Sequence, residues 1–292
     1  MHSVMLRQYA CDMPTDARSS NAVFTAPTPQ PANSGRPTTG DDVPYETIPL
    51  PSKGLLYPEG SPLHGVDAVH IRSMTAREED ILMSPALIKA GTAISALIRS
   101  CLVDKRIDPA DMIAGDRNAL VFAIRITGYG HEYEATVECS ECDDKTPRTF
   151  DLSRVDVNFL DLTPVREFEN RFEFVLPASH RTVHFRFLTG RAEESAQKTQ
   201  QARRKAIGPM ASQTVTDTLR DSIVSIDGVE DRQKVSDFVR SMLARDSLAL
   251  RKHITQHQPD IITRQVSECK ACGYAEEVSI PMGLSFLWPN AR

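Results

Sequence analysis

The sequence predicts an α+β fold, with helices and antiparallel hairpins and a zinc-ribbon-like site that joins distant parts of the chain. Three observations support this class. Apolar residues at helical spacing dominate residues 86–102 and recur between 190 and 257. Apolar and polar residues alternate in several short segments, as in antiparallel hairpins. Two C-x-x-C motifs, Cys139–Cys142 and Cys269–Cys272, each lie between two such segments.

Composition and charge exclude several classes of protein. The 292 residues are 40% hydrophobic and 25% charged, as in ordinary globular chains. The net charge of -5 has the wrong sign for a protein that mainly coats nucleic acid. No apolar run approaches the roughly 18 residues that a membrane-spanning helix needs, and charged residues occupy the N-terminus where a signal peptide is apolar. We therefore expect a cytosolic protein without membrane or nucleic-acid partners.

Shifts in composition divide the chain into four parts. Residues 1–44 are rich in proline and small polar residues, which predicts an extended arm: either a dispensable tail or a segment that becomes ordered on a neighbouring subunit. Residues 45–152 are expected to form a core that carries the first cysteine pair. Residues 153–264 are expected to be an inserted region of one hairpin and several helices. Residues 265–292 hold the second cysteine pair and an apolar C-terminus.

Capping and helix-breaking residues set the expected elements of the first half. Thr75 followed three residues later by Glu78 is a capping box that begins a helix. Gly128 and Gly130 stop a helix before a strand. The expected elements are an extended segment at 45–57, a strand at 66–71, helices at 75–83 and 86–102, a short helix from Asp108, a helix capped by Asp116, and hairpin strands at 131–139 and 148–152.

In the second half of the chain, helical spacing and strand alternation of apolar residues again predict the elements. Asp246 is expected to cap a helix. His253 and His257, four residues apart, are expected on a solvated helical end rather than as metal ligands. The expected elements are strands at 172–176 and 182–188, helices at 190–207, 215–225, 230–243 and 246–257, and an alternating hairpin at 266–280.

Cys139, Cys142, Cys269 and Cys272 are the candidate ligands of a zinc ion. In each motif the two thiolates leave a tight turn on the same side, so two facing turns place four sulfurs tetrahedrally, about 2.3 Å from the metal. Reduced surface thiols and a redox pair are the alternatives. Since 126 residues separate the two motifs, the metal would join the ends of a long insertion. Four cysteine ligands leave no open position, so the zinc would be structural.

An apolar group near the C-terminus and the absence of common catalytic motifs both bear on function. Phe286, Leu287 and Trp288 form a large apolar group that is expected to dock on the protein's own core or on a partner. The sequence contains no phosphate-binding loop, no G-x-S-x-G nucleophile motif and no H-E-x-x-H helix. We therefore expect no enzyme and no catalytic residues.

Five segments together resemble a known family. They are I-P-L-P-S-K-G-L-L-Y from Ile48, M-T-A-R-E-E-D-I-L from Met74, I-D-P-A-D-M-I-A-G-D-R-N-A-L from Ile107, R-I-T-G-Y-G-H-E-Y from Arg125 and C-S-E-C from Cys139. In this order and spacing the chain resembles the T4-type bacteriophage baseplate protein family, which includes a baseplate hub subunit and a hub assembly catalyst of contractile-tailed phages. The resemblance covers residues 45–152 well and 153–288 more loosely.

This resemblance implies a phage protein, made in the host bacterial cytoplasm, that takes part in building the tail baseplate. We expect a permanent structural component of the virion, at or near the hub, that bridges neighbouring baseplate and tail proteins in a symmetric ring. A non-virion assembly factor for the hub is the alternative. A zinc-ribbon nucleic-acid-binding protein is a lesser alternative, because acidic residues beside the cysteines would repel phosphates. These residues are Glu138, Glu141, Asp143, Asp144, Glu268, Glu276 and Glu277.

Overall fold

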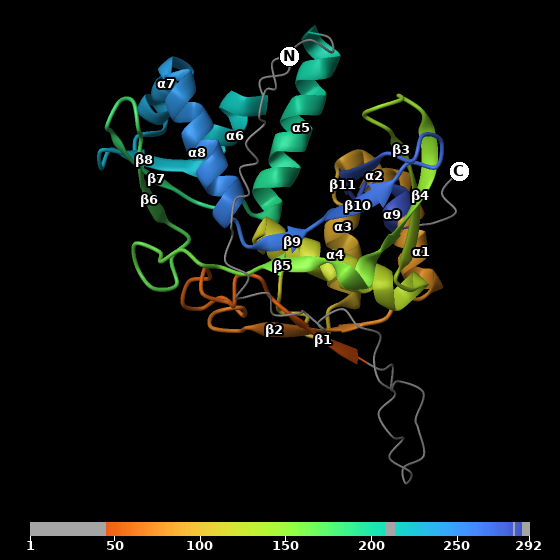
Figure 1. The fold of residues 1–292 in the computed structure, drawn as a ribbon. Helices are drawn as coiled ribbons and strands as arrows, with labels where there is room; N and C mark the ends of the chain where they lie inside the picture. The colour runs from red at the N-terminus through yellow and green to blue at the C-terminus, as the bar shows by residue number, and fades with distance from the viewer. Residues whose placement is uncertain (1–44, 208–213, 283, 288–292) are drawn as a thin grey trace, which may run out of the picture.

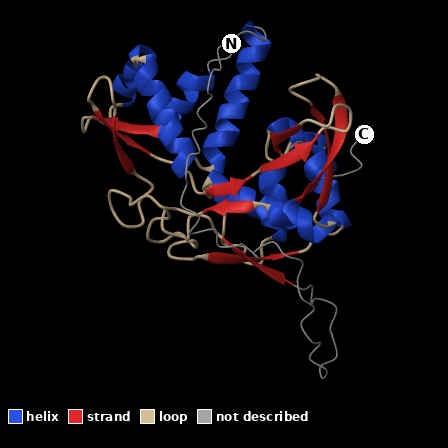
Figure 2. Cartoon of the chain, in the orientation of Figure 1, coloured by secondary structure: helices blue, strands red, loops and turns tan. Residues whose placement is uncertain are grey.

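The computed structural model describes residues 45–207, 214–282 and 284–287. These residues form both helices and antiparallel strands (Figure 1). The strands pair in small antiparallel sheets of two or three strands (Figure 2). The predicted α+β class is therefore confirmed. The predicted arm, residues 1–44, lies outside the described residues. None of the described helices is long and apolar enough to cross a membrane.

The central element is helix α4 (Ala114–Tyr129), whose first twelve residues are buried almost without interruption. Small and apolar residues lie around its whole circumference, which is the pattern of a helix inside a core. Leu120, Phe122 and Ile124 are completely buried. Helix α3 (Ala93–Cys101) packs beside it. Elements from the first, middle and last parts of the described chain contact α4, so this helix positions them relative to one another.

The N-terminal part of the described chain begins with a two-stranded sheet. Strand β1 (Tyr45–Pro49) pairs with β2 (Ala68–Arg72), and both contact α4. Helix α1 (Ala76–Met83) then begins at the predicted capping box. The Glu78 carboxylate accepts hydrogen bonds from the backbone N–H of Thr75 at 2.9 Å and from its hydroxyl at 2.6 Å. The capping prediction is confirmed.

Three predictions about the helices in the first half of the chain are wrong. The predicted helix at 86–102 divides into α2 (Pro85–Ala90) and α3, because Gly91 adopts a left-handed conformation that ends α2. The chain after Asp108 forms a turn rather than a helix, since the Asp108 carboxylate accepts the N–H of Ala110 at 3.0 Å. Asp116 is not a cap: α4 already begins two residues earlier, and the Asp116 side chain is fully buried.

Two β-hairpins carry the cysteine motifs, as predicted. Strand β3 (Glu132–Glu138) pairs with β4 (Lys145–Asp151), and β10 (Arg264–Glu268) pairs with β11 (Ala275–Ser279). Strands β4 and β10 contact each other, so the two hairpins lie side by side (Figure 1). Residues far apart in the sequence therefore share one end of the molecule.

The region between the hairpins contains a three-stranded sheet. Strands β6 (Phe172–Val175) and β7 (Thr182–Phe185) form the predicted hairpin. Strand β8 (Ile223–Ile226) pairs with β7, although the sequence predicts a helix through residue 225. This prediction is wrong because helix α6 (Thr214–Ser222) ends where two β-branched residues begin a strand whose partner lies about 40 residues away.

Helices cover this sheet, and the longest of them projects from the body of the molecule. Helix α5 (Gly190–Ile207) extends from the region of α4 (Figure 1), followed by α6, α7 (Arg232–Ser241) and α8 (Ala244–His257). His253 on α8 stacks on Phe174, with ring centroids 4.5 Å apart, so the predicted solvated position is wrong for this residue. The other helices and strands predicted between residues 172 and 257 are present, with differences only at their ends.

The segment between the two cysteine hairpins starts and ends at the same place. Strand β5 (Asp156–Asn158) pairs with β9 (Asp260–Ile262), which brings the beginning and the end of this segment together next to α4. Asp246, predicted as a cap, lies inside α8 and accepts the backbone N–H groups of Ala178 and Ser179 at 2.7 and 3.1 Å. The chain then passes through the second hairpin to α9 (Leu284–Leu287).

Candidate metal centre

The two C-x-x-C turns have the same backbone geometry. In the first turn, the N–H of Cys139 donates to the carbonyl of Asp144 at 3.0 Å, and the N–H of Asp143 donates back to Cys139. In the second turn, Cys269 and Tyr274 form the corresponding bond at 2.8 Å, and the N–H of Gly273 donates back to Cys269.

The residue after the second cysteine of each motif has a positive φ. It is 56° at Asp143 and 73° at Gly273. Asp and Gly are among the residues that accept this left-handed conformation at low cost. Each turn therefore closes tightly enough to place both of its thiols on one side.

The four predicted cysteines converge on a single point. Their Sγ atoms all lie within 4.8 Å of one another. The Sγ atoms of Cys139 and Cys272 are 3.8 Å apart, and those of Cys142 and Cys269 are 3.9 Å apart. Four thiolates around one ion at about 2.3 Å have sulfur–sulfur distances of about 3.8 Å, whereas a disulfide bond is about 2.05 Å long. The geometry therefore fits metal ligands and not disulfides.

Burial and electrostatics differ among the four thiols. Cys139 and Cys269 are buried, whereas Cys142 and Cys272 are exposed, so the site opens to solvent on one side. Backbone N–H groups of Cys272 and Ala271 lower the pKa of Cys269 to about 6. Hydrogen bonds of this kind favour the thiolate, which is the form that binds a metal. The site therefore offers four sulfur ligands, and the Cys269 thiol is the one whose ionisation the backbone favours.

A buried ion pair joins the two hairpins beneath the cysteines. Arg148 on β4 is 1% exposed and donates to the Glu276 carboxylate on β11 at 2.8 Å. It also donates to the carbonyl of Ser267 at 3.2 Å. Glu276 accepts a second hydrogen bond, from the hydroxyl of Ser140 in the first turn, at 2.5 Å. Glu276 thus contacts both the sheet and the turn of the opposite hairpin.

This ion pair was not predicted: Glu276 was considered only as an acidic residue beside the cysteines, and Arg148 was not considered. Arg148 stands two residues before Phe150, so strand alternation places both side chains on the same, buried face. That signal is present in the sequence. The partner of Arg148 was not predictable, because Glu276 is 128 positions away and the pairing depends on how the hairpins meet.

The apolar C-terminal residues pack on the protein's own core. Phe286 is 1% exposed, and its ring lies 4.8 Å from that of Phe122 and 5.1 Å from that of Tyr133. Leu287 is also buried. Both residues therefore dock on the protein's own core, which is one of the two predicted roles. Binding of a partner stays a prediction. Trp288 lies outside the described residues.

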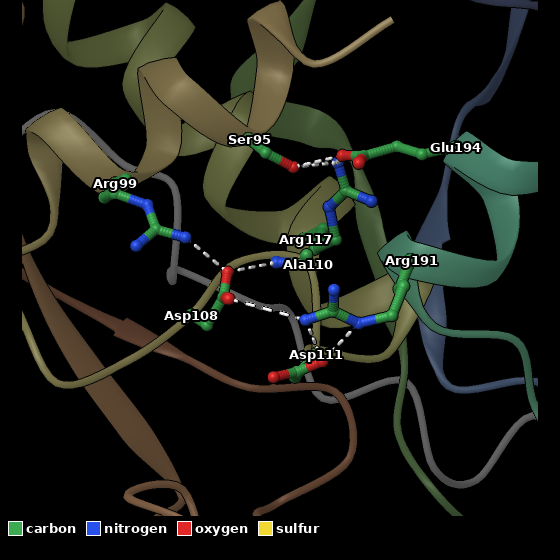
Figure 3. Close-up of polar contacts among 8 residues, drawn as sticks. All are labelled: Ser95, Arg99, Asp108, Ala110, Asp111, Arg117, Arg191 and Glu194. Carbon is green, nitrogen blue, oxygen red and sulfur yellow. Dashed lines mark hydrogen bonds and ion pairs between the residues drawn. The ribbon is translucent and has the colours of Figure 1, made fainter.

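A network of charged side chains fixes the first turn of α5 against the core (Figure 3). Arg191 forms ion pairs with Asp111 at 2.7 Å and with Asp108 at 3.5 Å. Glu194 accepts a hydrogen bond from Ser95 on α3 and lies 3.5 Å from the guanidinium of Arg117, which is 6% exposed. This network was not predicted, because its members come from four separate segments.

The fold and the site define an α+β protein whose two cysteine hairpins form a candidate metal centre. Residues 45–288 match the family model described as T4 bacteriophage base plate protein. The match spans most of the chain, so the chain belongs to this family. No curated protein and no solved structure matches it. Family membership implies interaction with other phage tail or baseplate proteins and points to the phage virion.

Proposed function

We propose that this chain is a permanent structural component of the phage tail baseplate, at or near the hub, and that it bridges neighbouring tail proteins during and after assembly. Membership in the baseplate family supports a role in this assembly. A metal ion held by the four clustered cysteines would have no open coordination position, so it would support the structure rather than catalyse a reaction.

The observation that carries this proposal is the convergence of four Sγ atoms within 4.8 Å. Four cysteine ligands, with sulfur–sulfur distances near those of a tetrahedral site, favour zinc, although iron is also held by four thiolates in some proteins. Such a zinc ion would hold the two hairpins together and would not take part in chemistry. Its binding free energy would contribute directly to folding.

The position of this site indicates what a metal ion would do for the architecture. One cysteine pair precedes the inserted region and the other follows it, and the β5–β9 pairing joins the same two segments nearer to α4. The zinc ion would therefore fix the second of two connections between the ends of the insertion. Surfaces on the core and on the insertion would then keep one relative orientation, which is what a bridging component needs.

The proposal is tested by metal content and by particle composition. Protein purified without added metal is expected to contain one zinc ion per chain by plasma mass spectrometry. Quantitative mass spectrometry of salt-washed phage particles is expected to find a small fixed copy number relative to the sheath protein. Abundance in infected cells with absence from particles would instead make the chain an assembly factor. Salt-sensitive DNA binding would favour the nucleic-acid alternative.

A further inference from the structure

A hollow of about 760 Å³ lies between α1, α3 and the first turn of α5. We call it the cationic hollow, because five of its lining side chains are cations. They are Arg72, Arg77, Arg99, Lys105 and Arg191. Only two carboxylates, Asp108 and Glu194, line the same surface. The excess of positive charge contrasts with the net charge of -5 of the whole chain.

Three of these cations have acidic partners. Arg72 pairs with Glu78 at 2.5 Å, Arg99 pairs with Asp108 at 2.5 Å, and Arg191 pairs with Asp111. These pairs hold the wall of the hollow in place (Figure 3 shows the last two).

The other two cations are not neutralised within the described residues. Lys105 donates only to the backbone carbonyls of Arg99 and Ser100, at 3.0 and 2.9 Å. Burial and the nearby Arg72 lower the pKa of Lys105, so an anion beside it would relieve an unfavourable environment. Arg77 is exposed and forms no ion pair with a described residue. The hollow therefore offers two unmatched positive charges to an acidic ligand.

The tips of the two cysteine hairpins carry the opposite charge. Their exposed acidic residues are Glu138, Glu141, Asp143, Asp144, Glu268 and Glu277. Lys145 and Lys270 are the cations at these tips, and Lys145 is already paired with Glu138 at 3.2 Å. Glu277 lies 3.9 Å from the guanidinium of Arg264, further along β10. Four thiolates around one zinc ion add a further net charge of about -2. We call this surface the acidic tip.

The acidic tip and the cationic hollow cannot meet within one copy as the chain is folded. In Figure 1 the loop of the β3–β4 hairpin extends to the edge of the molecule, away from α1 and from the base of α5. A surface that protrudes and a complementary surface that is hollowed, on different parts of one chain, suit a head-to-tail contact between copies. Contacts of this kind close into rings or continue as filaments.

We propose that the acidic tip of one copy docks in the cationic hollow of the next copy. This inference rests on the proposed function, because the zinc ion would hold the tip in shape. Glu141 and Glu268, each directly before a cysteine ligand, would lie near Arg77 and Lys105 of the neighbour. Complementary charge would give the contact its orientation and a strong dependence on ionic strength.

Two variants separate the two halves of the contact. The hollow variant combines Arg77→Glu with Lys105→Gln, which keeps a donor at position 105. The tip variant combines Glu141→Lys with Glu268→Lys, two exposed residues whose side chains form no hydrogen bond or ion pair with described residues. A matched control, Lys234→Glu with Lys252→Gln, makes the same charge change as the hollow variant on exposed positions of α7 and α8.

Sedimentation equilibrium of the purified full chain measures self-association at low and high salt. The wild type and the control are expected to associate at low salt and to dissociate at about 1 M salt, where screening is strong. Each variant alone is expected to associate at least tenfold more weakly. An equal mixture of the two variants still contains one intact tip and one intact hollow, so it is expected to form dimers and nothing larger.

A wild type that stays monomeric at low salt, an association that both variants retain, or a mixture that forms no dimer would each overturn the inference. Zinc content measured on the same samples keeps the two proposals apart. A zinc-loaded wild type that stays monomeric contradicts only the contact between copies. A chain without zinc contradicts the proposed metal centre. Capture of the hollow by the acidic surface of a different baseplate protein, with no self-association, also counts against a second copy as the occupant.

Discussion

The Tyr57 hydroxyl donates a hydrogen bond of 2.6 Å to the buried Asp116 carboxylate, and this bond connects two of the segments by which the family is recognised. Ser52 donates to the same carboxylate through its backbone N–H at 2.9 Å and its hydroxyl at 2.5 Å. Burial raises the pKa of Asp116. These residues therefore form a polar contact inside the core, and their place in the motif is explained by folding rather than by ligand binding.

Replacing Tyr57 with Phe should destabilise the protein by about 1–3 kcal/mol, because two buried groups lose their partner. The Asp116 carboxylate loses one donor, and the backbone N–H of Ile113 loses its acceptor, the Tyr57 oxygen at 3.0 Å. Urea unfolding followed by circular dichroism measures the difference. Tyr274→Phe is the matched control, since that tyrosine is 45% exposed and its removal should change stability little. Equal stability of both variants would contradict the importance of this contact.

Local features of the chain were predictable from the sequence, and pairings between distant segments were not. The capping box of Thr75 and Glu78 spans four residues, and each cysteine turn also depends only on neighbours. Asp116, in contrast, has the residue type of a helix cap, but tertiary contacts with Ser52 and Tyr57 use its carboxylate inside the helix. Local propensity is a weak guide where a buried partner from another segment competes for the same side chain.

The short strands illustrate the same limit. Strand β8 has only four residues, I-V-S-I, which continue the apolar spacing of the preceding helix. Strands β5 and β9 have three residues each, and their partners are about 100 residues apart along the chain. A segment of three or four residues has too few alternations to be distinguished from a helix end. Pairing with a distant strand decides its structure.

Gly115→Ala should destabilise the protein by roughly 1–3 kcal/mol or more, because an added Cβ would lie 1.8 Å from the backbone carbonyl oxygen of Pro259. This glycine allows α4 to approach the segment that leads into β9. Gly128→Ala, in the same helix, is the control: its Cβ would meet only the flexible side chain of Met74, at 3.2 Å. Higher helix propensity should make that variant neutral or up to about 1 kcal/mol more stable. Thermal unfolding of both variants compares them, and a harmless Gly115→Ala would contradict the packing of α4 on β9.

The ion pair between Glu78 and Arg72 should make stability depend on pH in the acidic range. Burial alone would raise the pKa of Glu78, but hydrogen bonds from Arg72, Ser100 and Thr75 outweigh it and lower this pKa far below its usual value. The stabilisation is therefore complete above the pKa of the unfolded chain, about 4.3, and is lost as the pH falls toward the lower folded-state pKa.

Glu78→Gln should accordingly be less stable than the wild type at pH 7. Below about pH 4.3 its free energy of unfolding should fall less steeply with falling pH than that of the wild type, by up to about 1.4 kcal/mol per pH unit, the slope that one proton gives. Urea unfolding at several pH values between 3 and 7 measures this slope. Glu59→Gln serves as the control, because Glu59 is exposed and has no hydrogen bond or ion pair with a described residue. Parallel pH profiles for the wild type and Glu78→Gln would show that this carboxylate does not carry the effect.

Replacing Cys139 and Cys272 together with Ser should remove the metal and lower the melting temperature by on the order of 10 °C, since binding at a structural zinc site is part of the folding free energy. The two residues belong to different hairpins, so each hairpin keeps one cysteine and neither can rebuild the site alone. Cys101→Ser is the control, because Cys101 is buried in α3 and lies outside the cysteine cluster. That variant should keep its zinc even if its core packing is weakened. Chelation of the wild type should reproduce the melting temperature of the double variant, and it should not lower the melting temperature of the double variant itself. If both proteins responded equally to the chelator, the four cysteines would not be the ligands.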